Sequence, residues 1–442
     1  MYITKITLDD VRCFEHIEFD LSSGRNVQKW GVILGDNAVG KTTLLRSIAM
    51  GLCDKTGAAG LLQDTYGDWI RKTKRSRKKD ATIKIDLVEG RNPYWIKTTI
   101  YRSDAGIETV KQETFPPTKF PWEKIFVCGY GANRSIEGST YHEVYSTADA
   151  LYTLFNYDYP LQGPELMLRR IARTKKQIDE ICAWIDEVLM LDKESTKLDD
   201  AGIKIKGKWG RDVHLGSLAD GHVATITLVL DMLGWALLKR LKKQKNKLQG
   251  IVLIDEIEQH LHPSWQKYII KLLNNVFPNL QFIVTTHSPL CAIGTANLPE
   301  PDKVCTLILL SQEADHVAAR DKIVPPRGKR ADQVLTSYLF DLATTRSDGT
   351  IQQIERYSAL LAKDKRSQKE KSELVDLRKK LNEELGSAET PLQQLVGEAV
   401  RKALDKLVAE TVKAKKLPKE AIDFEIIRKI NELFGKGKYD KD

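Results

Sequence analysis

The chain has 442 residues, of which 42% are hydrophobic and 29% are charged, so it is long and apolar enough for two or three folded units of roughly 150 residues each. Its six cysteines form no CxxC pair, so we expect neither a disulfide framework nor a cysteine zinc site. We see neither a signal peptide nor an apolar run of roughly 18 residues, so we expect no membrane contact and a cytoplasmic location. The net charge of +9 is small for this length, and it permits contact with nucleic acid without indicating it.

The first elements in chain order are strands. Residues 2–21 alternate apolar and polar side chains, which predicts two paired strands with a turn near Asp9 and Asp10. An apolar run then predicts a buried strand at 29–34, and apolar residues at helical spacing predict a helix that ends near Leu52. A glycine-rich loop joins this strand to this helix.

That loop matches the pattern G-x-x-x-x-G-K-[ST] between a predicted strand and a predicted helix. Glycines let backbone N–H groups point at phosphate oxygens, and the start of a helix adds a favourable dipole. We therefore expect Lys41 to contact the β- and γ-phosphates of ATP and the Thr42 hydroxyl to hold Mg²⁺. The expected nucleotide-binding residues of the loop are Gly35, Asn37, Gly40, Lys41, Thr42 and Thr43.

The middle of the chain alternates between strand and helix patterns. Residues 81–90 and 94–103 predict an antiparallel hairpin, which follows a basic run at 71–79. Residues 124–130 predict a buried strand, and apolar residues recur at helical spacing over 164–191.

The second half predicts a further hairpin, a long helix and two buried strands. The hairpin is expected at 203–215 and the helix at 224–243. The apolar runs at 251–254 and 280–285 are typical of strands inside a parallel sheet, and a helix from Pro263 is expected between them.

Two acids follow the first of these apolar strands. Hydrolysis of a bound nucleotide requires a carboxylate for the metal ion and a group that takes a proton from the attacking water. We expect Asp255 to hold Mg²⁺ and Glu256 to act as the general base. A buried strand that happens to end in two acids is the alternative.

A histidine follows the second apolar strand. His287 has Thr285, Thr286 and Ser288 beside it, and we expect its imidazole to donate a hydrogen bond to the γ-phosphate. The alternative is an ordinary histidine whose hydrogen bonds are satisfied within the fold.

Taken in order, these motifs resemble those of ATP-binding-cassette ATPases of the SMC and RecF type, over about residues 1–312. GDNAVGKTTLL is similar to their G-x-N-G-x-G-K-[ST] form, with Ala38 where a third glycine is frequent. DEIEQHLHP and TTHSP resemble the stand-alone RecF- and OLD-like ATPases of bacteria. The resemblance implies an α/β P-loop fold of ABC type with an antiparallel hairpin insert, a short helical insert and a helical C-terminal extension.

In that family a signature segment of one subunit covers the nucleotide held by another, so the resemblance implies a homo-oligomer. Residues 218–221, LADG, occupy this place before a long helix. Asp220 and Gly221 are therefore expected to face the γ-phosphate of a neighbouring copy. Ala219 replaces the usual serine, which implies a weaker cap and slow turnover; an ordinary helix cap by Asp220 is the alternative.

Two further positions follow from the resemblance. Arg12 stands where related ATPases carry an arginine near the phosphates, and a surface arginine on a strand is the alternative. Residues 129–134 stand where a glutamine usually senses the metal ion; without a glutamine there, Asn133 or Arg134 is the expected substitute.

These motifs divide the chain into four expected parts. They are an N-terminal ATPase lobe at 1–163, a short helical insert at 164–208, a C-terminal ATPase lobe at 209–326 and a helical tail at 327–442. The tail carries two apolar stripes at helical spacing, at 374–381 and 392–404, which either dock on a partner or fold back on the core.

The chain lacks the long coiled coil of SMC proteins and the strand–acid clusters of the nuclease unit in OLD proteins, so we expect it to cleave no nucleic acid itself. It resembles the ATPase subunits of bacterial anti-phage systems of the Septu, retron and PARIS types. This implies ATP and Mg²⁺ as cofactors and a separately encoded effector nuclease as partner. The alternatives are a RecF-like repair ATPase that acts directly on DNA and, less favoured, the nucleotide-binding subunit of a transporter.

Overall fold

The computed structural model describes residues 1–24, 26–65, 68–72, 79–134, 142–199, 202–206, 211–241, 248–363 and 366–385. The chain divides into two compact units, Met1–Thr345 and Arg346–Asp442. The division therefore falls after Thr345, whereas the helical tail is expected from residue 327 onward. All the motifs described above lie in the first unit.

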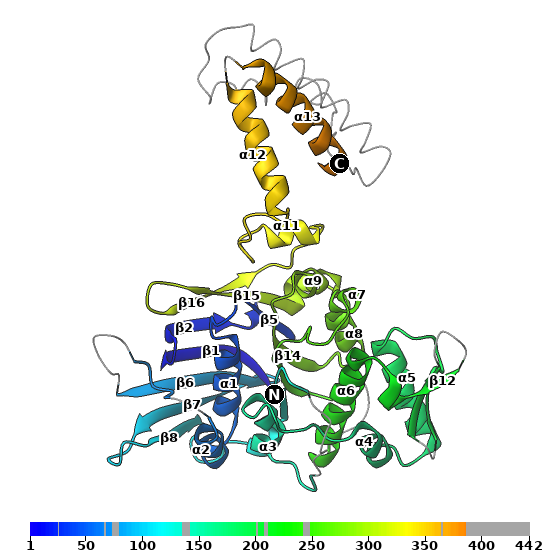
Figure 1. Ribbon diagram of the computed structural model, residues 1–442. Helices are drawn as coiled ribbons and strands as arrows, with labels where there is room; N and C mark the ends of the chain where they lie inside the picture. The colour runs from blue at the N-terminus through cyan, green and yellow to red at the C-terminus, as the bar shows by residue number, and fades with distance from the viewer. Residues whose placement is uncertain are drawn as a thin grey trace, which may run out of the picture. The chain divides into compact units, whose positions relative to one another are not determined.

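A six-stranded sheet with the strand order β16-β15-β5-β14-β13-β9 forms the centre of the first unit (Figure 1). The strands from β15 to β9 are parallel, and β16 runs antiparallel at one edge. This is the sheet of an α/β P-loop fold. Its strands are β5 Trp30–Leu34, β9 Val127–Tyr130, β13 Gly250–Ile254, β14 Leu280–Thr285, β15 Cys305–Gln312 and β16 Val317–Ile323.

The strand order explains how distant motifs meet. β14 lies between β5 and β13, with Thr285 opposite Ile33 and Val284 opposite Ile254. Because the three strands are parallel, the loops that follow them leave the sheet at the same edge. The glycine-rich loop follows β5, the acid pair follows β13 and His287 follows β14, so all three motifs lie along that edge.

Alternate residues of the central strands point into two separate apolar cores, as the two-residue period of a strand requires. Ile33 and Leu253 join the core beneath α1, whereas Val32 and Ile254 join the core beneath α6. α1, Lys41–Leu52, contacts β13 and β14 on one side and the antiparallel strands on the other.

A second, antiparallel sheet with the order β2-β1-β6-β7-β8 covers α1, on the left in Figure 1. The expected hairpin at 81–90 and 94–103 corresponds to β6 and β7. The turn expected near Asp9 and Asp10 is misplaced, because β1 continues until Val11 pairs with Phe14 and both are buried. The strands are β1 Tyr2–Val11, β2 Phe14–Asp20, β6 Asp80–Glu89, β7 Asn92–Arg102 and β8 Glu108–Phe115.

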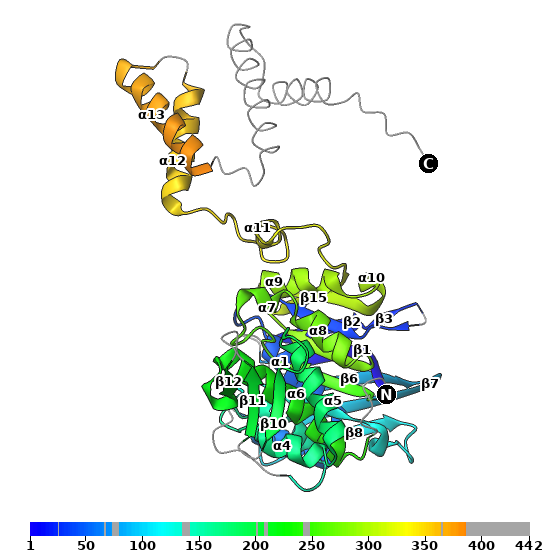
Figure 2. The same cartoon turned by 90° about the vertical axis from the view of Figure 1, so that its right-hand side faces the viewer.

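Helices and a small three-stranded sheet cover the opposite face and stand in front in Figure 2. The helix expected over 164–191 is two helices, because Thr174 leaves helical geometry and its side chain caps the second one. The expected helix from Pro263 is likewise interrupted, at Lys267 and Tyr268. The elements are α4 Pro164–Ile171, α5 Lys175–Val188, β10 Thr196–Asp199, β11 Gly202–Lys206, β12 Asp212–His214, α6 Asp220–Leu238, α7 Pro263–Gln266 and α8 Ile269–Val276.

α6 is the one described helix that is long and apolar enough to cross a membrane by length and composition, but 78% of its apolar window is buried inside the protein. Its apolar character therefore serves the core. The remaining described strands and α-helices of this unit are β3 Ser22–Ser23, β4 Asn26–Val27, α2 Lys55–Gln63, α3 Thr147–Leu151, α9 Pro289–Gly294, α10 Pro301–Val304 and α11 Ala331–Leu335.

The described part of the second unit is a pair of helices, α12 Asp348–Ala362 and α13 Gln368–Leu385. Ion pairs join them, with Arg356 donating two hydrogen bonds to Glu373. The first expected apolar stripe, at 374–381, lies on α13 and ends in the buried Leu381. The second stripe, at 392–404, lies outside the described residues.

Gln281 links the parallel sheet to the antiparallel one. Its buried amide accepts a hydrogen bond from the Ile3 N–H at 2.7 Å and donates to the carbonyl oxygens of Ile3 and Gln28 at 2.8 and 2.9 Å. Gln281→Leu leaves these groups buried without partners, so we expect the free energy of unfolding to fall by about 3 kcal/mol in urea titrations. Gln63→Leu, on the exposed side of α2, is the control and should change it by no more than about 0.5 kcal/mol. Equal effects of the two substitutions would contradict the linking role.

Candidate active site

The glycine-rich loop after β5 turns through backbone conformations that side chains disfavour. Gly35, Ala38 and Gly40 have φ values of 150°, 65° and 88°. A Cβ at Gly40 would lie 2.6 Å from the Cys13 sulfur, and one at Gly35 would lie 2.7 Å from the Leu310 carbonyl oxygen, so neither position accepts a side chain. Successive residues of this kind form a concave surface of N–H groups that suits a phosphate.

Lys41 begins α1 and folds back over the loop. Its ammonium donates to the carbonyl oxygens of Gly35 at 2.7 Å and Asp36 at 2.8 Å. Burial lowers its pKa, and the nearby carboxylates of Glu256 and Asp255 oppose that shift. An incoming phosphate would therefore replace two neutral carbonyl partners with a charged one. Of the other expected loop residues, Asn37 is exposed and Thr43 is half-buried on α1.

The carboxylate of Asp255 is the centre of the site. It is buried, with 2% of the residue exposed, and both of its oxygens accept hydrogen bonds. Thr42 Oγ1 donates to Oδ2 at 2.6 Å, and Thr285 Oγ1 donates to Oδ1 at 2.5 Å. The Thr285 hydroxyl in turn accepts the N–H of Glu256 at 2.8 Å. The structure thus joins the loop after β5, the acid pair and the end of β14 in one chain of hydrogen bonds.

Arg134 holds the backbone of the acid pair. It is buried, and its Nη2 donates to the carbonyl oxygens of Asp255 and Glu256 at 2.8 Å each. Burial lowers its pKa to about 10, so the guanidinium stays charged at neutral pH. Glu256 has a φ of 47°, a left-handed conformation that costs a non-glycine residue roughly 1–2 kcal/mol. The two hydrogen bonds from Arg134 stabilise this conformation.

Of the two substitutes considered for the missing glutamine, the structure brings only Arg134 to the acid pair. Asn133 is exposed, and its amide donates to the carbonyl oxygen of Tyr157 at 2.9 Å. Arg134 contacts the backbone of the acid pair through Nη2, which differs from the expected role in sensing a metal ion.

His287 is held by a residue that sequence reasoning missed. Glu258 is 5% exposed, and its Oε1 accepts the backbone N–H of His287 at 2.7 Å and lies 2.9 Å from the His287 Nδ1. Half of the His287 side chain is exposed. In the sequence, Glu258 is visible only as a third acid, two residues after Glu256.

Arg12 occupies the turn between β1 and β2, with a φ of 48°. Its guanidinium lies 4.1 Å from the centre of the Trp69 ring, an attractive cation–π contact. Burial lowers its pKa, and the like charge of Arg46 adds to that effect. The neighbouring residue, Cys13, packs directly against Gly40, so Arg12 lies one residue away from a contact with the loop.

The segment 218–221 leads into α6. Ala219 is the N-cap residue and makes no side-chain capping bond, whereas Asp220 is the first helical residue and is exposed. The alternative in which Asp220 caps the helix is therefore wrong. A Cβ at Gly221 would lie 2.5 Å from the His260 carbonyl oxygen, so this glycine allows α6 to begin against the loop that follows the acid pair.

Most of the basic run at 71–79 lies outside the described residues, which include only Arg71, Lys72 and Lys79 of it. Residues 242–247 of a second basic stretch, at 239–247, also lie outside them. Arg71 is 3% exposed, and its guanidinium donates a hydrogen bond to the Glu15 carboxylate at 3.0 Å, so its charge is paired within the fold.

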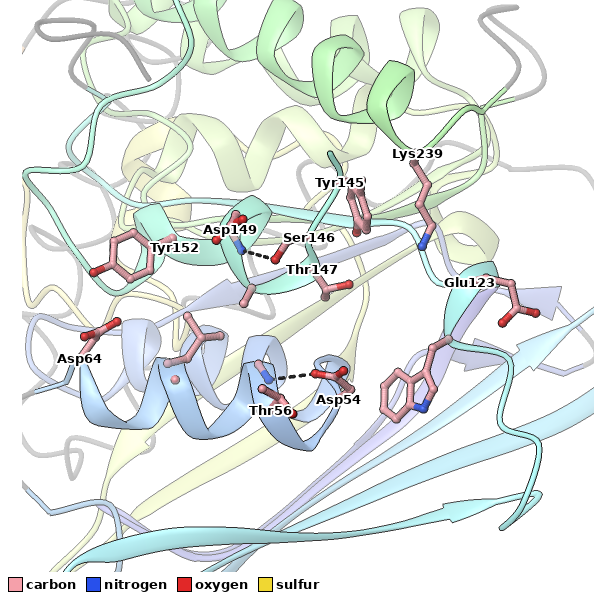
Figure 3. A pocket seen from close by; sticks show the side chains of 15 residues that line it. Asp54, Thr56, Asp64, Glu123, Tyr145, Ser146, Thr147, Asp149, Tyr152 and Lys239 are labelled. Atoms are coloured by element: carbon pink, nitrogen blue, oxygen red, sulfur yellow. Dashed lines mark hydrogen bonds between the residues drawn. The ribbon is translucent and has the colours of Figure 1, made fainter. Parts of the chain in front are cut away.

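A cavity of about 640 Å³ lies between α2 and α3, beside the end of α6 (Figure 3). Asp54, Asp64, Glu123 and Asp149 surround it together with Lys239, which points into it from the end of α6. Its lining includes none of the expected nucleotide-binding residues. The loop after β5, with Lys41 and the hydrogen-bonded Asp255, therefore lies outside this cavity.

The chain is similar to one protein-family model and to several known proteins. Residues 209–292 match the family model "AAA domain, putative AbiEii toxin, Type IV TA system". The chain is 26% identical over 407 residues to the Septu protein PtuA of Bacillus mycoides, covering 90% of this chain and 53% of that protein. It is 37% identical over 128 residues to the retron Vc95 probable ATPase of Vibrio cholerae, covering 28% of this chain and 24% of that protein.

The SMC head domain from Thermotoga maritima aligns with a TM-score of 0.43 at 15% identity, covering 72% of this chain and 98% of that one. The fold assignment rests on the strand order rather than on this alignment. The chain spans about half the length of the Septu relative that it matches. The resemblance predicted from the motifs is confirmed, since the chain is similar to Septu PtuA and to the retron probable ATPase, and its residues 209–292 match an AAA domain model.

Arg134→Met tests the contact with the acid pair. The substitution leaves the carbonyl oxygens of Asp255 and Glu256 without their donor, so we expect the rate of ATP hydrolysis to fall roughly 10- to 100-fold, as for other groups that orient a metal-binding carboxylate. A phosphate-release assay measures the rate, and thermal melting checks the fold. Asn133→Ala is the matched control and should hydrolyse at the parental rate. A loss of the same size in both variants would contradict the role of Arg134.

Proposed function

We propose that this chain is the ATP-binding and ATP-hydrolysing regulatory subunit of a bacterial anti-phage defence complex, and that it controls a separately encoded effector nuclease in the cytoplasm. The observation that carries the ATPase part is the chain of hydrogen bonds from Thr42 through Asp255 and Thr285 to Glu256. The similarity to Septu and retron proteins supports the defence role.

The oxygen atoms of Thr42 and Asp255 suit a magnesium ion as ligands. Mg²⁺ takes oxygen ligands at 2.0–2.1 Å in an octahedron, which places neighbouring ligands about 3 Å apart. Thr42 Oγ1 and Asp255 Oδ2 lie 2.6 Å apart, so a small separation would let both serve as neighbouring ligands. A bound Mg²⁺ would neutralise charge on the phosphates, while Thr285 keeps the other Asp255 oxygen in place.

The remaining groups have separate roles in this proposal. The loop amides and Lys41 bind the phosphates, and Glu256 takes the proton from the attacking water. Arg134 and Thr285 hold Glu256 by its backbone carbonyl and N–H groups, which orients the carboxylate without occupying it.

A second copy completes the site in this proposal. The first turn of α6, with the exposed Asp220 and the partly buried Gly221, would cover the nucleotide held by a neighbouring copy, as in the ATPases that the motifs resemble. ATP would hold the copies together, and hydrolysis would release them. The complex would couple this closing and opening to the effector.

Lys41→Ala tests nucleotide binding. Loss of a charged hydrogen bond of about 1.5–3 kcal/mol predicts ATP affinity that is weaker by roughly 10- to 100-fold. Calorimetric titration with ATP measures the affinity. Bacteria that express the variant with its flanking genes should lose protection in a phage plating assay. Full protection by a variant that binds no ATP would disprove the proposed regulation by nucleotide.

Glu256→Gln tests the general base. The amide keeps the size of the side chain but cannot take a proton, so we expect hydrolysis to fall at least about 100-fold while ATP binding is retained. Size-exclusion chromatography with ATP should show a larger assembly that persists longer than that of the parent. Hydrolysis at the parental rate would show that another group is the base.

A further inference from the structure

Glu258, in the loop after β13, is buried and contacts His287, which follows the neighbouring strand β14. The residue is 5% exposed, and its Oε1 accepts the backbone N–H of His287 at 2.7 Å. The same oxygen lies 2.9 Å from the His287 Nδ1. Its second oxygen, Oε2, has no hydrogen-bond partner among the described residues.

These distances determine which nitrogen of His287 carries the proton. Oε1 already accepts a hydrogen bond from the backbone N–H of His287, so it is an acceptor toward Nδ1 as well. A hydrogen bond at Nδ1 therefore requires the proton to be on Nδ1. In a neutral imidazole only one nitrogen is protonated, which leaves Nε2 as an acceptor on the side of the ring away from Glu258.

Arg134 ties Glu258 to the acid pair. Among the carboxylates that oppose the effect of burial on the pKa of Arg134, Glu258 has the largest influence. Arg134 Nε also lacks a hydrogen-bond partner among the described residues, as does Glu258 Oε2. The opposite charges of the two buried side chains therefore stabilise each other. Arg134 donates to the carbonyl oxygens of Asp255 and Glu256, and Glu258 contacts His287, so both buried charged groups border the acid pair and the histidine.

We propose that Glu258 is a positioning residue that holds His287 as the Nδ1–H tautomer, so that the neutral ring accepts a hydrogen bond from the attacking water through Nε2. This inference rests on the proposed ATP hydrolysis. It differs from the expectation that His287 donates to the γ-phosphate, because a neutral ring in this tautomer has no proton on Nε2. Water held by Nε2 would be oriented for proton transfer to Glu256.

A double-mutant cycle tests the action of Glu258 through His287. Glu258→Gln should lower kcat roughly 10- to 100-fold, as for other partners of site residues, while ATP affinity changes by less than about twofold. In a His287→Ala background the same substitution should cause no further loss. An equal loss of kcat in both backgrounds would overturn the proposal, because Glu258 would then act independently of the histidine.

Asp186→Asn is the matched control. Asp186 is a carboxylate that is 4% exposed and accepts the N–H groups of Ser195 and Thr196, far along the chain from the site motifs. The control substitution should lower the melting temperature but leave kcat per folded molecule unchanged in both backgrounds. A fall in kcat equal to that of Glu258→Gln would assign the effect to general destabilisation and overturn the proposal.

The tautomer is measured without reference to hydrolysis. ¹⁵N NMR of the histidine-labelled full chain, with the His287 signals identified by their loss in His287→Ala, should show a protonated Nδ1 and an unprotonated Nε2 for the neutral ring. The opposite tautomer would overturn the proposal even in an active enzyme. A chain with the expected tautomer that hydrolyses no ATP would instead disprove the proposed function and leave the orientation of His287 by Glu258 established.

Discussion

The two hydrogen bonds to the Asp255 carboxylate hold the site together. Each oxygen receives one hydroxyl, from Thr42 on α1 and from Thr285 at the end of β14. A buried carboxylate without such donors is costly, so the three segments are stable only in this mutual arrangement. The parallel order β5-β14-β13 makes the arrangement available, because it brings the ends of the three strands to one edge.

The sequence predicts the central sheet well and the boundaries of the helices less well. β5 and β13 are continuous apolar runs, and β14 is interrupted only by Gln281 before its terminal Thr285; such runs have few alternatives to a buried strand. The helix break at Thr174 and the turn after Val11 depend on local hydrogen bonds and on which side chains reach the core. A periodic pattern continues through such points, so it does not reveal them.

The same distinction applies to the site. Short motifs predict four of the proposed site residues, because their residue types suit phosphate, metal and proton chemistry: Lys41, Thr42, Asp255 and Glu256. The contacts of Glu258 and Arg134 arise only in the folded chain: Arg134 reaches a carbonyl group 121 residues away. Arg134 is expected near the site only through the resemblance, with Asn133 as an equal alternative. An acid two residues after Glu256 looks like an ordinary charged residue in the sequence.

The close packing of Gly221 on His260 has a mechanical consequence. With no side chain as a spacer, the first turn of α6 rests directly on the main chain four residues beyond Glu256. In the proposed ATPase, a rearrangement of the loop after the acid pair would therefore push directly on the start of this helix. Any molecule seated on that tip would sense the chemical state of the site through backbone contact alone.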